Sequence, residues 1–212
     1  MKETRAYHHG NLRQKLLDAA LQAVESNGYQ ALSLRDLAQA VGVTRAAPYR
    51  HFADRDALLR ACAQEGFRHL LHAQHGTMQA ALSAQEKARQ VCQAFLTFSE
   101  RQPELLMLMY DSGLLQQADE DDELGELLRR LYEEVKTALG EALAEQDEAR
   151  LRARMIAMWS TLYGYARLRQ SRMLKPYMVN PLSQEQTEAA VISAAILVDL
   201  PAPLPPDNVV TI

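Results

Sequence analysis

Apolar residues recur along this chain three and four positions apart, and apolar and polar residues nowhere alternate over a sustained stretch. Spacings of three and four place side chains on one face of a helix, whereas alternation is typical of a half-buried strand. In residues 10–27 the apolar stripe ends just before Gly28, a residue suited to a helix C-terminus. We therefore predict an all-α fold.

Capping residues, glycines and prolines bound nine predicted helices. Their expected ranges are 10–27, 33–41, 44–51, 54 to between 75 and 82, 83–101, 103–111, 119–145, 147–174 and 183–200. Pro103 suits a first helical turn, and the pair Lys175 and Pro176 ends the eighth helix. The proline-rich end of the chain, 201–212, is expected to be extended or disordered.

A turn containing glycine joins the second predicted helix to the third. Ser33 can cap the second helix, Gly42 can adopt a positive φ in the turn, and Thr44 can cap the third helix. Two short helices joined by such a turn form a helix–turn–helix. The alternative is a polar surface turn in an unrelated helical domain.

The stretch GVTRAAPYRHF, which contains this turn, has the chemistry that a DNA recognition helix needs. Arg45 could make a bidentate contact to guanine, while Tyr49 and His51 could reach phosphates. Pro48 conflicts with a regular helix, because it removes the first N–H that would form a hydrogen bond inside a helix capped by Thr44.

The charge of the chain is unevenly divided, although its composition is that of an ordinary globular protein. The 212 residues are 48% apolar and 24% charged, with a net charge of −4. Through Gly76 there are 10 Lys and Arg against 7 Asp and Glu, and from Thr77 onward 13 against 20. A basic first part on an acidic body is expected when only one end meets an acidic partner.

Several function classes are not supported by the sequence. No apolar run approaches the roughly 20 residues of a membrane helix, and no hydrophobic signal region opens the chain, so we expect no membrane contact and a cytoplasmic location. We find no nucleophile–base pair, glycine-rich phosphate loop or complete metal constellation. We therefore predict neither an enzyme nor a cofactor.

The cysteines and histidines have simpler interpretations than a metal site. Cys62 and Cys92 are best interpreted as reduced thiols in the core. His69, His72 and His75 lie at helical spacing, but they do not make up a complete ligand set. No metal site is predicted.

Residues 7–61 closely resemble the DNA-binding domain of the tetracycline-repressor (TetR) family of bacterial transcription regulators. The resemblance rests on SLRDLAQAVGVT for the second helix and turn, YRHF at the end of the third helix, and FADRDALL after it. It implies a three-helix DNA-binding head with an N-terminal arm over 1–53. A helical-bundle domain for ligand sensing and dimerisation would span 54–200, within which 54–82 form the connecting helix.

The resemblance also implies which residues contact DNA. By likeness of position they are Ser33, Arg35, Thr44, Arg45, Tyr49, Arg50, His51 and Arg55. Arg55 falls where the family usually has a phosphate-contacting lysine. Arg5, His8 and His9 could form an arm on the DNA. Pro48 is unusual for the family as a whole, but it fits a subgroup with the sequence AAPYRHF.

Seven of the eight methionines, and the only tryptophan, lie after Thr77. Methionine adapts to irregular cavities, so these residues could line an apolar pocket or fill a solid core. The resemblance favours the pocket, because most members of the family sense small molecules in this domain. The candidate ligand-contacting residues are Phe95, Phe98, Met109, Tyr110, Met155, Trp159 and Tyr163.

The last predicted helix carries no charge from Ala189 to Val198, so every face of it must be covered. A second copy of the chain would cover it most easily, with the eighth and ninth helices of both copies forming a four-helix interface. Ala190, Ala194 and Leu197 are the candidate interface residues. The alternative is a central helix in a monomer.

These observations give two hypotheses for function. The first is a repressor that binds double-stranded DNA as a homodimer and leaves a palindromic operator when a small apolar or amphipathic molecule binds. Ligand entry would shift the connecting helix and change the separation of the two recognition helices. The second is a constitutive or partner-controlled DNA-binding regulator, which could act as an activator.

Overall fold

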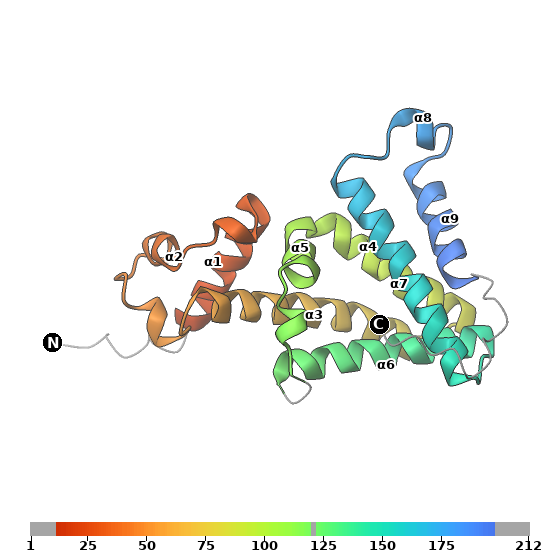
Figure 1. The fold of residues 1–212 in the computed structure, drawn as a ribbon, viewed down its shortest axis with the longest axis horizontal. Helices are drawn as coiled ribbons and strands as arrows, with labels where there is room; N and C mark the ends of the chain where they lie inside the picture. The colour runs from red at the N-terminus through yellow and green to blue at the C-terminus, as the bar shows by residue number, and fades with distance from the viewer. Residues whose placement is uncertain (1–11, 120–121, 198–212) are drawn as a thin grey trace, which may run out of the picture. The chain divides into compact units, whose positions relative to one another are not determined.

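The computed structural model describes residues 12–119 and 122–197, and all regular secondary structure in this part of the chain is helical (Figure 1). The α-helices are α1 (Leu12–Asn27), α2 (Leu34–Ala40), α3 (Arg55–Gln79), α4 (Ala84–Arg101), α5 (Pro103–Asp111), α6 (Glu123–Leu143), α7 (Glu148–Gln170), α8 (Pro176–Val179) and α9 (Gln184–Ile196). Three 3₁₀ turns are η1 (Tyr29–Ala31), η2 (Pro48–Arg50) and η3 (Leu115–Gln117). The predicted all-α fold is confirmed. The predicted N-terminal arm and the proline-rich end lie outside the described residues.

Most of the helices begin at the predicted capping residues, but α6 begins at Glu123 rather than near Asp119. Ser183 forms a full capping box at the start of α9: its N–H donates to Gln186 Oε1 (2.8 Å), and the N–H of Gln186 donates to Ser183 Oγ (3.1 Å). Other side chains that accept a backbone N–H at a helix start are Ser33, Asp54, Ser83 and Asp147. Local capping chemistry therefore fixes most of the helix starts.

Two predicted boundaries need correction. The segment 44–51 is not an α-helix, because Pro48 lacks the N–H that an α-helix would need there. The connection between α7 and α9 contains the short helix α8, although we interpreted Pro176 only as the end of a helix. A proline at the first position of a helix loses no helical hydrogen bond, so Pro176 starts α8, whereas α7 ends earlier than predicted, at Gln170.

The chain divides into two compact units by its packing. The N-terminal unit contains 1–72 and 101–131, and the C-terminal unit contains 73–100 and 132–212. The predicted boundary after residue 53 divides the chain by expected function and not by packing, so it stays a prediction.

In the N-terminal unit, α1 packs against α2, η1 and α5. The carboxylate of Glu25 on α1 accepts hydrogen bonds from the first free N–H groups of α5, those of Glu104 (3.5 Å) and Leu105 (3.3 Å). Burial raises the pKa of the Glu25 carboxyl, and the two N–H groups partly oppose that rise. The start of α5 is therefore held by α1.

Helices α3 and α5 approach closely in the same unit. A Cβ atom on Gly66 of α3 would overlap the side chain of Met109 and lie 3.3 Å from Cγ of Leu105, both on α5. The rings of Phe67 and Tyr110 meet edge to face, with centroids 5.6 Å apart. A glycine and an aromatic pair thus set the distance between these two helices.

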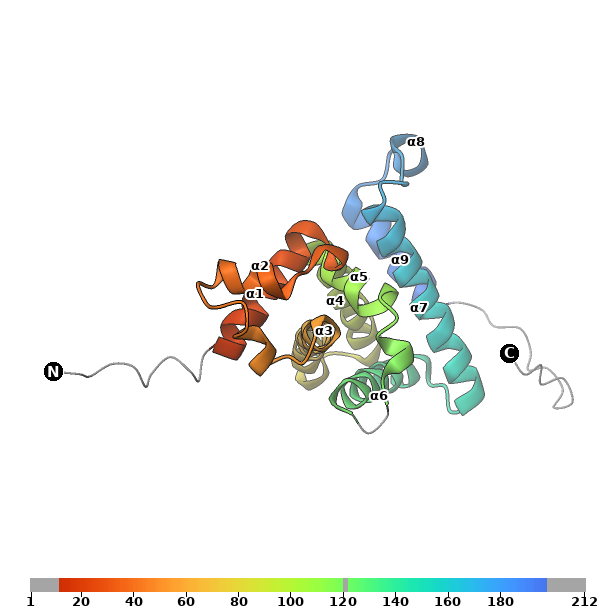
Figure 2. The ribbon, with the colours of Figure 1, turned by 60° about the vertical axis from the view of Figure 1, so that its left-hand side comes forward.

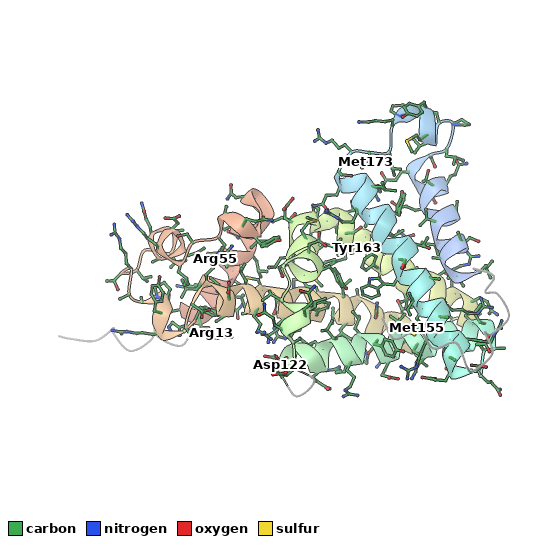
Figure 3. The ribbon with its side chains drawn as sticks, in the orientation of Figure 1. Arg13, Arg55, Asp122, Met155, Tyr163 and Met173 are labelled. Carbon is green, nitrogen blue, oxygen red and sulfur yellow. The ribbon has the colours of Figure 1, made fainter. Side chains whose placement is uncertain are left out.

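The start of α6 is also fixed within the N-terminal unit. Asp122 Oδ1 accepts the N–H of Gly125 (2.8 Å), and this bond, with Arg60 of α3 at 2.7 Å from Oδ2, holds the pKa of Asp122 below its usual range (Figure 3). An acidic side chain is favoured at a helix start, so Asp122 fixes where α6 begins.

In the C-terminal unit, α7 and α9 lie side by side (Figures 1 and 2). A buried carboxylate joins this pair to α4. Glu188 of α9 accepts from Arg169 of α7 (2.7 Å) and from Gln93 of α4 (3.0 Å), and Arg169 also pairs with Glu100 of α4 (3.0 Å). Only 8% of Glu188 is exposed, and its carboxylate is satisfied by these donors.

Candidate functional site

The segment predicted as a recognition helix is a turn followed by η2. The N–H of Ala47 donates to the carbonyl of Thr44 (2.9 Å), the N–H of Arg50 to that of Ala47 (3.2 Å), and the N–H of His51 to that of Pro48 (2.9 Å). These bonds span three residues, whereas those of an α-helix span four. Pro48 has no N–H for the carbonyl of Thr44, so the backbone tightens and Ala47 supplies the donor instead.

Two residues of this segment are buried and anchor it, while several others are exposed. Pro48 and Phe52 are buried, and the guanidinium of Arg13 lies over the Phe52 ring at 5.2 Å from its centroid. Phe52 and Pro48 therefore anchor the segment. The exposed residues include Thr44, Arg45, Tyr49 and Arg50.

The turn before this segment has the geometry that the sequence predicts. Gly42 has a φ of +72°, the N–H of Val43 donates to the carbonyl of Ala38 (2.9 Å), and the N–H of Gly42 donates to that of Gln39 (3.2 Å). This is a Schellman end to α2, for which glycine is best suited. Arg35 on α2 is exposed, and α2 packs against η2. Together they form a helix–turn–helix.

Arg55 has a structural role that sequence reasoning missed. Its Nε donates to the carbonyl of Leu32 (3.0 Å), and its Nη2 donates to those of Tyr29 (2.7 Å) and Gln30 (3.2 Å) (Figure 3). These carbonyls lie at and just after η1, and that of Tyr29 also accepts the N–H of Leu32 (3.2 Å). The sequence carries only a weak signal for this role, because nothing local to Arg55 indicates that it binds carbonyls more than 20 positions earlier in the chain. Its predicted contact with a phosphate stays a prediction.

The candidate ligand-contacting residues fall in two different units. Met109 and Tyr110 belong to the N-terminal unit, where Met109 is fully buried against α3. The other five belong to the C-terminal unit: Phe95, Phe98, Met155, Trp159 and Tyr163. The rings of Phe95 on α4 and Trp159 on α7 lie close together, with centroids 5.9 Å apart. Met155 and Tyr163 also belong to α7 (Figure 3). Their role in ligand binding stays a prediction.

The candidate interface residues on α9 stand on an uncovered face. Ala190 and Ala194 are exposed, and Leu197 is 62% exposed, while Ile192 and Ala195 on the other face are buried. On the neighbouring helix α7, the exposed apolar residues include Ile156 and Trp159. One chain therefore covers only one side of α9.

The histidines of α3 do not come together. His69 Nδ1 lies 3.3 Å from Gln102 Oε1, whereas His75 faces Glu134 and Gln79. Within 12–119 and 122–197, no group of three or more His, Cys, Asp or Glu is placed to hold a metal ion. In the same part of the chain, no helix has the length and hydropathy to span a bilayer.

Both cysteines are free and buried, as predicted for core thiols. Burial raises the pKa of Cys62 and of Cys92 to about 12, because it disfavours the charged thiolate. Neither thiol is therefore reactive in the folded protein.

A helix–turn–helix that presents arginines and a tyrosine, joined to a larger helical part, defines a DNA-binding regulator of the helix–turn–helix class. Residues 16–62 match the family model of the bacterial regulatory proteins of the tetR family, and residues 88–198 match the tetracyclin repressor-like C-terminal domain. The second match alone spans just over half of the 212 residues. The chain belongs to the TetR family of transcription regulators.

Relatives in sequence include the nucleoid occlusion factor SlmA. The protein of Vibrio vulnificus is 29% identical over 137 residues, and that of Photobacterium profundum is 32% identical over 144 residues. Each match covers 64% of this chain and 68% of the relative.

Solved structures share the fold. A protein with unknown function from Rhodococcus sp. RHA1 has a TM-score of 0.74 and 29% identity, over 91% of this chain and 97% of that one. The TetR family transcriptional regulator PfmR from Thermus thermophilus has a TM-score of 0.61 and 22% identity, over 86% of this chain and 97% of that one. The second likeness supports the fold alone.

Proposed function

We propose that this TetR-family regulator is a homodimeric repressor that leaves a palindromic operator when a small apolar or amphipathic molecule binds its C-terminal part. It would act in the cytoplasm of a bacterium, on the chromosome. The observation that carries the DNA-binding part is the outward set of Thr44, Arg45, Tyr49 and Arg50 on a segment anchored by Pro48.

In this proposal the segment 42–52 enters the major groove. Arg45 reads guanine, because a guanidinium can donate to O6 and N7 of one base at the same time. Tyr49, His51 and the residues Ser33 and Arg35 hold the phosphates beside it. The tight 3₁₀ backbone supports this role, since it holds Tyr49 and Arg50 outward from a buried proline.

The homodimer in this proposal uses the uncovered face of α7 and α9. Exposed alanines on α9 allow helices to approach closely, and Leu197, Ile156 and Trp159 supply apolar area around them. Two copies related by a two-fold axis would present two recognition segments to a palindromic site. Such segments must lie about 34–36 Å apart, or a multiple of that distance.

Release of the operator follows if the small molecule binds the DNA-incompetent state more tightly. The candidate ligand contacts in the C-terminal unit, around Phe95 and Trp159, supply an aromatic environment suited to an apolar molecule. The connecting helix α3 would carry the change to the head. If a saturating inducer left operator affinity unaltered, this mechanism would be wrong.

The experiment is a selection of bound genomic fragments with the purified full-length protein, followed by titration of the best fragment at two salt concentrations. A palindromic site bound by a dimer, with affinity that falls steeply as salt rises, supports the proposal. A folded dimeric protein that enriches no site contradicts it. Genes beside the site then suggest compounds for an inducer test.

A second candidate is a DNA-binding factor controlled by a partner protein. The observation in its favour is the 29% and 32% identity to two nucleoid occlusion factors, over 64% of this chain. The same selection separates the two candidates. A repressor should enrich a few sites near promoters, whereas a nucleoid factor should enrich many sites spread over the chromosome.

A further inference from the structure

Exposed large apolar side chains are concentrated on one part of the C-terminal unit. Among the described residues only Tyr49 is exposed in this way elsewhere. The others lie on α7, at the end of α9 or on the connection between these helices: Ile156, Trp159, Leu168, Met173, Tyr177, Met178, Leu182 and Leu197. Four of the eight lie within 173–182, and exposed apolar residues gathered in this way favour contact with a partner.

The connection 171–183, which contains α8 and is called the hairpin below, holds four of these eight residues, including the most exposed one, Tyr177, at 83%. Met173 is 58% exposed and Met178 56%. Figure 3 shows Met173 just beyond the end of α7. The hairpin carries Arg172 and Lys175 but no acidic residue, so an ordinary polar surface loop does not explain its composition.

The backbone of the hairpin is fixed at both ends. At its start the N–H of Met173 donates to the carbonyl of Leu168 (3.0 Å), a Schellman end that puts Arg172 at a φ of +55°. Inside it the N–H of Asn180 donates to the carbonyl of Pro176 (2.8 Å), and Ser183 caps α9 at its end. The apolar side chains therefore stand outward on an ordered backbone.

We propose that the hairpin is an arm that packs on a second copy of this chain. The inference rests on the proposed homodimer and adds to it a contact outside the four helices. The hairpin joins the end of α7 to the start of α9, and these two helices lie side by side, so the hairpin adjoins the proposed interface face of α7 and α9.

This position beside the α7–α9 face is the reason for choosing a second copy as the partner. A two-fold interface uses the same patch on both molecules, so a copy that covers the α7–α9 face comes up against the hairpin at its edge. Any change in the hairpin is then present twice in the dimer, once from each copy. This doubling makes the dimer sensitive to small changes in the hairpin.

The test is the dissociation constant of the full-length dimer, measured by sedimentation over a range of protein concentrations. The variant carries Tyr177→Ser and Met178→Ser together, and Lys175→Ser is the matched control from the same hairpin. We expect the double variant to weaken the dimer at least tenfold and the control to leave it unchanged. Ile156→Ser, on the α7 face, tests the homodimer separately.

The outcomes separate the arm from the dimer. If Ile156→Ser weakens the dimer and the hairpin variant does not, the arm is wrong and the homodimer stands. A wild-type protein that is monomeric at every concentration overturns both. If the double variant fails to fold, amide exchange of 173–182 in the wild-type protein decides: protection that is lost on dilution supports the arm, and exchange that is fast at every concentration refutes it.

Discussion

Arg45 and Arg55 are both basic residues near the ends of the recognition segment, but their guanidinium groups are used differently. Arg45 is exposed on a turn, whereas Arg55 donates to three backbone carbonyls of its own unit. The family resemblance assigns both to DNA. The contacts in the structure support that assignment better for Arg45, because its side chain stands in solvent.

Replacing Arg45 with alanine tests base reading. We expect Arg45→Ala to cost on the order of 1–3 kcal/mol of binding free energy at the operator, with weak binding to random DNA largely retained. Fluorescence titrations with operator and random duplexes measure both quantities. Tyr49→Phe is the comparison, and it should weaken both. Equal losses on the two DNAs for Arg45→Ala would remove Arg45 from base reading.

Replacing Arg55 tests its structural role. Arg55→Ala would leave the carbonyls of Leu32 and Tyr29 without this donor, so we expect the free energy of unfolding to fall by about 1–2 kcal/mol. Arg55→Lys should restore only part of the loss, because an ammonium lacks the planar fork that reaches three carbonyls. Denaturant titration measures this. Unchanged stability with weaker DNA binding would favour the phosphate contact instead.

At the scale of the helices, one buried carboxylate joins α9 to α7 and α4. Glu188→Ala would leave Arg169 with Glu100 alone and Gln93 without its acceptor. We expect a loss of about 2–3 kcal/mol in the free energy of unfolding, since the pair is largely buried.

The matched control is Glu100→Ala, which removes the more exposed partner of the same arginine. Its side chain is 48% exposed, so the expected loss is below about 1 kcal/mol. Thermal or denaturant unfolding of both variants gives the comparison. Similar losses for the two variants would mean that Glu188 does not anchor α9.

The sequence predicts most helix starts because capping is a local property of a few neighbouring residues. Ser33, Asp54, Asp147 and Ser183 all accept the expected N–H. The prediction of an α-helix over 44–51 is wrong. The sequence shows that Pro48 disfavours an α-helix, but it does not show that the backbone forms a turn and a 3₁₀ helix instead. Helix α8 escapes prediction because four residues carry no periodic pattern.

Of the candidate site, the exposed faces can be predicted from sequence and the packing partners cannot. A stripe of apolar residues says which side of a helix is buried, but not against which helix. Met109 is an example: the sequence groups it with Trp159 as a ligand contact, yet the two residues belong to different units. The contacts of Arg55 cannot be predicted from sequence either, since the carbonyls of Leu32 and Tyr29 lie 23 and 26 positions away along the chain.

At the scale of the whole molecule, packing does not follow the order of the chain. Helix α5 and the start of α6 belong with the DNA-binding head, and Glu25 of α1 holds the first N–H groups of α5. The head is therefore tied to α5 by packing as well as to the connecting helix by the chain. A change that reaches α5 would reach the head directly.

The two buried cysteines can report local unfolding of the two units separately. Cys62 lies in the N-terminal unit and Cys92 in the C-terminal unit, and the chain has no other thiol. Since each is protected only while its own surroundings stay closed, the rate at which a thiol reagent modifies it reports the opening of that unit alone. Equal rates at the two positions would mean that the protein opens as one body. Unequal rates would mean that the head and the remainder loosen separately, which is the property that a regulator needs if one end is to respond to an event at the other.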